Sequence, residues 1–187
     1  MVEKDVIEEI KRYDPNFSKI EFNRWCGDVL KILQEAWSKK DLETLKYYET
    51  KNLYKLHEKQ LNAMKEREVV NITKDMEIGK IKIIDYNRMP DCEIFKVIIS
   101  VSLIDYYQKE NSMLILSGSL NQKVNVDYKL EIVRVKGFLT DWLVDKSITV
   151  CPNCGATINL LQQNKCEYCD SMFITMNNSY KIKELEI

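Results

Sequence analysis

Helical periodicity dominates the first third of the chain, where apolar residues recur at steps of three and four. This spacing predicts a short helix over residues 2–13, a long one from Ser18, a short one over 42–48 and another over 52–67. The long helix is strongly apolar on one face, which carries Phe22, Trp25, Cys26, Val29, Leu33, Ala36 and Trp37. We expect the helix over 52–67 to bury Leu53, Leu56, His57, Gln60, Leu61 and Met64.

Local signals define the helix starts. Pro15 disfavours helix at Asp14, and Ser18 with Glu21 forms a capping box in which Phe17 is placed as the hydrophobic staple. Asp41 is a suitable cap for the short third helix.

From Val69 onward the period changes from 3.6 to 2, which is typical of strands. We expect strands over 78–86, 92–107, 113–116, 124–132 and 138–144. In the second of these, Phe95, Val97, Ile99, Val101 and Leu103 share one face. Helices followed by a meander of strands predict an α+β fold with an antiparallel sheet packed on N-terminal helices.

Four cysteines form the most specific motif. Cys151 and Cys154 make one C-x2-C pair, eleven residues separate it from the next, and Cys166 and Cys169 make the second. Four thiolates in two such loops suit tetrahedral zinc and leave no open coordination position, so the predicted site is structural. Gly155 supplies the left-handed backbone that such a loop needs. Paired disulfides and an iron–sulfur or redox site are the alternatives.

Around these cysteines we expect a small zinc ribbon that depends on its metal for folding. The predicted division is an α+β domain over residues 1–145, the ribbon over 146–176 and a polar tail over 177–187. The tail is rich in charged residues, so we expect a frayed end or a loose helix.

Composition narrows the function classes. The net charge of −1 gives no general basis for nucleic-acid binding, and the ribbon has no basic stripe or aromatic platform for reading nucleic acid. Only Cys26 and Cys92 lie outside the motif, and two cysteines are too few for a disulfide framework. This use of cysteine indicates a reducing compartment. A membrane-spanning helix needs roughly 18 or more consecutive apolar residues. The sequence contains no such run, so no membrane span is predicted.

His57 is the single histidine and falls on the predicted buried stripe beside Gln60. It could serve as a general base or pH sensor, but no nucleophile or carboxylate motif accompanies it. We therefore interpret it as a hydrogen-bonded core histidine.

Several of these residues together resemble the family of the peripheral subunit (number forty-four) of the mitochondrial inner-membrane translocase. The similarity rests on Asp14-Pro-Asn-Phe-Ser18, Trp25, Gln34-x-Ala36-Trp37, Leu53, Asp105, Gly118-Ser119, Tyr128 and Arg134. A four-cysteine ribbon directly after the domain is similar to the bacterial branch of that family.

The resemblance implies a cone-like domain, similar to nuclear transport factor two, in which helices pack into a curved sheet around an apolar pocket. It implies a non-enzymatic scaffold for transport that engages a protein or membrane complex. The implied location is the cytoplasm, or the inner face of the membrane as a peripheral protein. No feature of the sequence indicates an oligomeric state. We expect the pocket to be lined by Trp25, Trp37, Tyr86, Asp105 and Tyr128.

The alternative function is a small-ligand receptor or acid–base enzyme that uses this pocket, with Tyr106 as a further wall residue. A pocket closed by Trp25 and Trp37 would favour the scaffold. An open pocket with a buried, convergent carboxylate would favour the ligand-binding or enzymatic function.

Overall fold

The computed structural model describes residues 3–112, 114–140, 148–150, 154–159, 167–169 and 180–187. The helices come first, and they are α1 (Glu3–Tyr13), α2 (Lys19–Lys39), α3 (Leu42–Tyr48) and α4 (Lys51–Glu66). The strands are β1 (Val69–Arg88), β2 (Cys92–Lys109), β3 (Ile115–Gly118), β4 (Val124–Val135), β5 (Ile148–Val150), β6 (Thr157–Asn159) and β7 (Tyr180–Glu186). The α+β prediction is confirmed.

The expected caps form at the helix starts. Ser18 Oγ accepts a hydrogen bond from the Glu21 N–H. The rings of Phe17 and Phe22 lie 5.3 Å apart, which is the contact expected of a hydrophobic staple. Asp41 Oδ1 accepts from the Thr44 N–H at 3.2 Å and caps α3. These local signals therefore determine where α2 and α3 begin.

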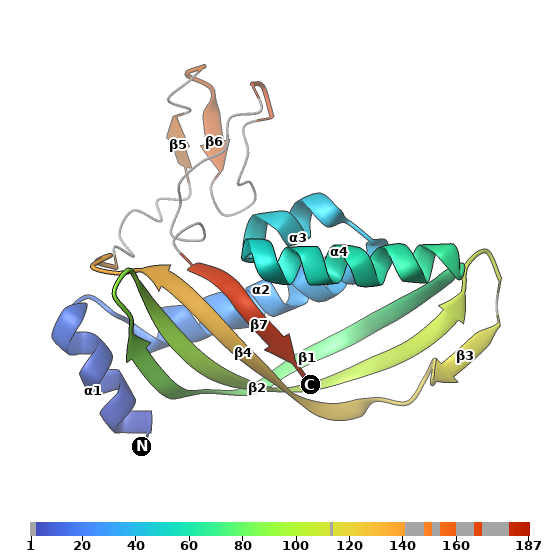
Figure 1. Cartoon of the computed structure of the whole chain (residues 1–187), viewed down its shortest axis with the longest axis horizontal. Helices are drawn as coiled ribbons and strands as arrows, with labels where there is room; N and C mark the ends of the chain where they lie inside the picture. The colour runs from blue at the N-terminus through green and yellow to red at the C-terminus, as the bar shows by residue number, and fades with distance from the viewer. Residues whose placement is uncertain (1–2, 113, 141–147, 151–153, 160–166, 170–179) are drawn as a thin grey trace.

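One antiparallel sheet has the strand order β1-β2-β4-β7, and β3 pairs with the end of β2. Figure 1 shows the long strands β1 and β2 bending beneath α2, α3 and α4, so that the helices cover the concave side of the sheet. The β1–β2 register shifts between Lys74 and Glu77, between Ile78 and Ile81, and between Ile83 and Asp85. Such bulges bend and twist a strand, which accounts for the curvature.

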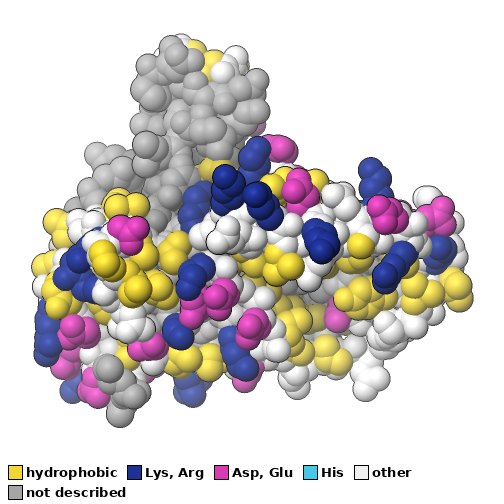
Figure 2. Space-filling view, viewed as in Figure 1, with side chains coloured by type: hydrophobic (Ala, Val, Ile, Leu, Met, Phe, Trp, Pro, Cys, Tyr) yellow, Lys and Arg dark blue, Asp and Glu magenta, His cyan; other side chains and the backbone are white. Residues whose placement is uncertain are grey.

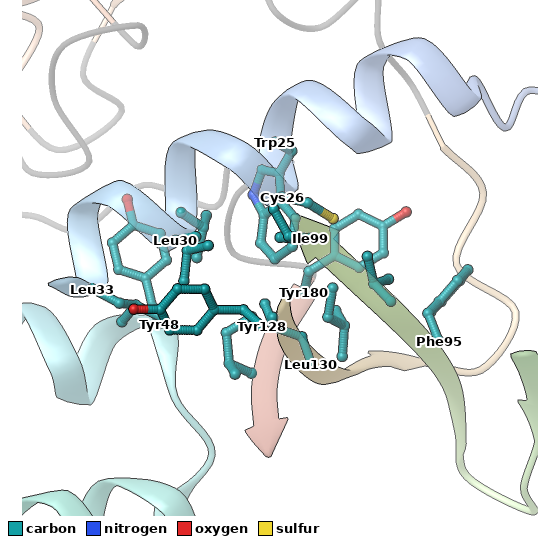
Figure 3. Close-up of a cluster of buried hydrophobic side chains, with 14 of the residues drawn as sticks. Trp25, Cys26, Leu30, Leu33, Tyr48, Phe95, Ile99, Tyr128, Leu130 and Tyr180 are labelled. Carbon is teal, nitrogen blue, oxygen red and sulfur yellow. The ribbon is translucent and has the colours of Figure 1, made fainter. Parts of the chain in front are cut away.

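The core lies between α2 and the concave face of the sheet. Figure 3 shows Trp25, Leu30 and Leu33 of α2 above side chains of β2, β4 and β7, including Ile99, Leu130 and Tyr180. The predicted inward face of β2, from Phe95 to Leu103, is buried at every second position. The period-2 pattern therefore assigned the buried face of this strand correctly.

A buried ionic network ties the helices to the sheet at one end. Arg134 on β4 donates from Nη1 to Asp14 Oδ2 at 2.7 Å and from Nη2 to Glu93 Oε2 at 2.6 Å. Its Nη1 also lies 3.1 Å from the Tyr180 hydroxyl and from Thr140 Oγ1. Burial acts to lower the pKa of Arg134, yet its partners hold that pKa above the ordinary value.

The prediction of a frayed or loosely helical tail over 177–187 is wrong for Tyr180–Glu186, which form strand β7. Residues Tyr180–Glu186 pair with β4, and Tyr180 and Ile182 are buried. The β4–β7 register shifts between Glu131 and Ile132, so Ile182 and Leu185 lie opposite Ile132 and Leu130 although they are three residues apart. This irregularity breaks the period of two that would otherwise have indicated a strand.

The strand predicted over 138–144 is also wrong where it can be compared. Residues 138–140 are not in a strand, and 141–144 lie outside the described residues. The Thr140 N–H donates to Asp14 Oδ1 at 3.0 Å, so a side chain takes the place of a ladder partner. The position beside β4 is occupied by β7 instead.

In α4 the predicted stripe is too wide. Leu56 is 51% exposed and Gln60 is also exposed, whereas Leu53 and Leu61 are buried. The helix meets the rest of the fold through a narrow face only, because one side of it points to solvent.

We predict that Arg134→Met destabilises the protein, because Asp14 would remain buried without its cation and Glu93 would keep only Arg88, at 3.3 Å. Removing one partner of a buried ion pair lowers the free energy of unfolding by about 3–5 kcal/mol. Urea unfolding followed by circular dichroism measures the change.

The control is Lys129→Met, at an exposed position of the same strand. A surface substitution of this kind should change stability by roughly 0.5 kcal/mol or less. Equal effects from the two variants would contradict the role of the network.

Candidate functional site

A cavity of about 150 Å³ lies between the helices and the concave side of the sheet, away from the Arg134 network. Its walls come from all three covering helices and from three strands or their ends. They are formed by Leu33, Gln34, Trp37, Leu45, Glu49, His57, Asn71, Tyr107, Leu185 and Ile187.

Secondary structure brings these residues together in simple ways. Leu33 and Trp37 are one helical turn apart on α2 and share a face. Asn71 and Tyr107 are register partners on β1 and β2, so both project from the same side of the sheet. Leu185 and Ile187 are supplied by β7 and the residue after it.

Glu49 occupies the junction between α3 and α4. Its N–H closes α3 by donating to the Leu45 carbonyl at 2.9 Å, and the next N–H, that of Thr50, donates to the Ile182 carbonyl on β7 at 2.8 Å. The junction is therefore fixed to the sheet, and the Glu49 side chain is fully buried.

His57 pairs with this carboxylate across the junction. His57 Nδ1 lies 2.7 Å from Glu49 Oε1, and the Trp37 ring contacts the imidazole edge-on with 5.1 Å between the ring centres. His57 itself is largely buried. The two ionisable side chains thus form a dyad in the cavity wall, with one Glu49 oxygen left over.

A second polar pair supports the opposite wall. Asn71 Nδ2 donates to Asp105 Oδ1 at 2.7 Å and to the Tyr106 carbonyl at 3.2 Å. Asp105 does not line the cavity itself but orients Asn71, which does.

The five residues expected to line the pocket do not share one cavity. Trp37 lines it and Asp105 contacts a wall residue. Trp25 packs against Phe22 and Tyr180, and Tyr86 packs against Phe95, so both belong to the core nearer the Arg134 network. Tyr128 is buried in the hydrophobic core beside Tyr48 (Figure 3), where burial and then the charge of Asp105 raise its pKa to about 12.

Sequence reasoning placed His57 correctly near the interior but missed its partner. Glu49 lies eight residues away and across a helix break, so no helical spacing connects the two. The signal that could have found it is the break itself, since only Glu49 and Thr50 separate α3 from α4 and so tight a junction brings Glu49 back to His57.

Of the predicted metal ligands, the structure describes Cys154 and Cys169, whereas Cys151 and Cys166 lie outside the described residues. Strands β5 and β6 pair antiparallel on either side of the first C-x2-C, as a ribbon hairpin would. Gly155 has φ +76°, the predicted left-handed conformation. Among residues that can be placed, no group of three metal-ligating side chains occurs.

Comparison with known proteins establishes the family. A model described as "Tim44-like domain" matches residues 3–146, which is well over half of the chain. The chain belongs to the Tim44-like domain family. No curated protein matches it significantly. A solved structure of the intermembrane space region of the chloroplast protein ARC6 is similar at a TM-score of 0.47 and 9% identity, covering 92% of this chain and 97% of that one.

The Tim44-like match ends at residue 146, before the cysteine motif and before β7. Strand β7, which completes the sheet, therefore lies outside the matched region. So do Leu185 and Ile187, two of the residues that line the cavity. Within the described part of this Tim44-like protein, no helix has the length and apolarity needed to cross a bilayer.

We predict that Tyr128 makes the protein sensitive to alkali. Its pKa is about 12 in the folded state against an ordinary 10.0, so its stabilising contribution is complete below pH 10 and is lost as the pH rises toward 12. Between pH 8 and pH 11, Tyr128→Phe should lose about 1 kcal/mol less stability than the unaltered protein.

Urea unfolding at the two pH values measures this difference. Tyr168→Phe, at a side chain that is 78% exposed, is the control and should leave the loss unchanged. An equal loss in the Tyr128→Phe variant would show that the phenol does not titrate with folding.

Proposed function

We propose that this protein is a non-enzymatic binding or scaffold protein that engages a protein or membrane complex in transport. Membership in the Tim44-like domain family is the observation that carries the proposal. We further propose that it acts in the cytoplasm or as a peripheral protein at the inner face of the membrane, and that its four-cysteine motif marks the bacterial branch of the family.

A surface suited to a partner lies at the end of the sheet that carries β3. Tyr107, Leu114 and Leu116 are 39%, 59% and 48% exposed and lie on, or directly beside, the paired ends of β2 and β3. We call these three residues the β3 rim. Figure 2 shows hydrophobic side chains gathered below α4 toward this end of the molecule. Single exposed apolar residues are common, but a group of them on one hairpin is typical of contact surfaces.

The four cysteines would hold one structural zinc ion. The β5–β6 hairpin around the first cysteine pair and the left-handed Gly155 support this assignment. Because the motif lies between β4 and β7, the metal would organise an insertion within the sheet domain and not a separate C-terminal unit. When bound, the zinc would serve to fold this insertion.

We predict one zinc ion per chain by elemental analysis, falling well below one in Cys154→Ser because a tetrahedral site would lose a ligand. The described core includes neither Cys154 nor Cys169, so the far-UV spectrum should keep most of its amplitude. Cys92→Ser, outside the motif, is the matched control and should keep its zinc. A zinc content near zero in the unaltered protein, with only the thiols of Cys26 and Cys92 titratable in denaturant, would indicate disulfides instead.

We also predict that the β3 rim carries partner binding. The experiment cross-links the full chain to its partners in its source cell, with membranes retained. The double variant Leu114→Glu/Leu116→Glu should lower the yield of cross-linked proteins at least about tenfold, because burying a carboxylate at an apolar contact is costly.

The control for this experiment is Val135→Glu/Leu139→Glu, which changes two residues that are 70% and 55% exposed near the opposite end of β4. It should keep the same cross-linked proteins, quantified by mass spectrometry. Loss in the control and not in the rim variant would place the contact elsewhere, and turnover of a metabolite by the pure protein would overturn the non-enzymatic assignment.

A further inference from the structure

The Glu49–His57 dyad leaves one acceptor without a partner. Glu49 Oε1 contacts His57, but Oε2 is buried and has no hydrogen-bond partner among the described residues. A buried carboxylate oxygen with no donor is unfavourable, and most buried polar groups in proteins are paired. A hydrogen-bond donor that enters the cavity would satisfy this oxygen.

The charge of the cavity favours a cationic donor. Of the ten described residues that line it, none is a lysine or an arginine, and Glu49 is the single carboxylate. When Glu49 is ionised, the His57 Nδ1–H donates to Oε1. Among the described lining residues, neither a donor nor a lysine or arginine cation stands beside Oε2, and an ammonium group would supply both.

The remaining lining residues indicate that the rest of the ligand is small and apolar. Leu33, Leu45, Leu185 and Ile187 are aliphatic, and Trp37 and Tyr107 offer aromatic rings that attract cations. The cavity volume is about 150 Å³, and an apolar cavity of that order holds a molecule the size of benzene. Tyr107 is 39% exposed and Ile187 is 72% exposed, so the cavity reaches the surface and a small molecule can enter.

We propose that this cavity binds a small primary alkylamine as its ammonium ion. The ammonium group donates to Glu49 Oε2, and the hydrocarbon chain lies against the leucines and Trp37. Glu49 recognises the charge, His57 orients the carboxylate, and the cavity volume limits the length of the chain. This assignment stands on the cavity alone and does not depend on the β3 rim or on zinc.

The first test compares three probes of matched length with the unaltered full chain: n-pentylamine, 1-pentanol and pentanoate. Titration followed by the Trp37 indole and His57 imidazole resonances in a nitrogen-15-labelled sample reports binding at the site. We expect the amine to bind at least about tenfold more tightly than the alcohol, because only the amine offers a charged donor to the carboxylate, and pentanoate should not bind. Equal binding of the amine and alcohol, or no binding of the amine, would overturn the proposal.

The second test removes the charge and keeps the shape. Glu49→Gln should lower amine affinity at least about tenfold while the alcohol still binds, because the amide accepts from His57 but no longer attracts a cation. Glu43→Gln, on the exposed side of α3, is the matched control and should leave both affinities unchanged. Unchanged amine affinity in Glu49→Gln would overturn the role of Glu49, and the probe series with the unaltered protein decides the case if that variant does not fold.

Discussion

The arrangement of the chain depends on the buried charge of Arg134. Its guanidinium is 1% exposed and contacts Asp14 before α2, Glu93 on β2 and Tyr180 on β7. A buried cation is tolerated only when anions and hydrogen bonds surround it, so each partner must be in place for the others to be stable. The network therefore joins the segment between α1 and α2, one end of β2 and β4, and the last strand of the sheet in one cooperative unit.

The closing strand β7 transmits this constraint to the cavity. Its first residue, Tyr180, is in the Arg134 network, its Ile182 carbonyl accepts from Thr50, and Leu185 lines the cavity. Since Glu49 precedes Thr50, the strand that completes the sheet also fixes the carboxylate of the candidate site. The cysteine motif lies between β4 and β7, so whatever orders that insertion acts on the chain segment that leads into this strand.

The curved sheet covered by helices is as expected, but the expected pocket lined by both Trp25 and Trp37 does not form. Trp25 fills the core near Tyr180, whereas Trp37 alone reaches the cavity. The cavity contains a buried carboxylate, the feature that would favour a small ligand, while the exposed β3 rim suits a larger partner. A scaffold with a ligand-occupied cavity accommodates both observations, because the two surfaces are formed largely by different residues.

Sequence alone determined the features that depend on near neighbours. The four helices, the caps at Ser18 and Asp41, and the buried face of β2 follow from spacing and local hydrogen bonding, which are properties of short segments. Tertiary structure decided what depends on distant segments: the pairing of β7 with β4, the enclosure of Arg134, and the meeting of Glu49 with His57. The physical reasons are two. A register shift breaks the period of two in β7. The partner of a buried charge is set by how strands and helices pack and not by residues nearby in the chain.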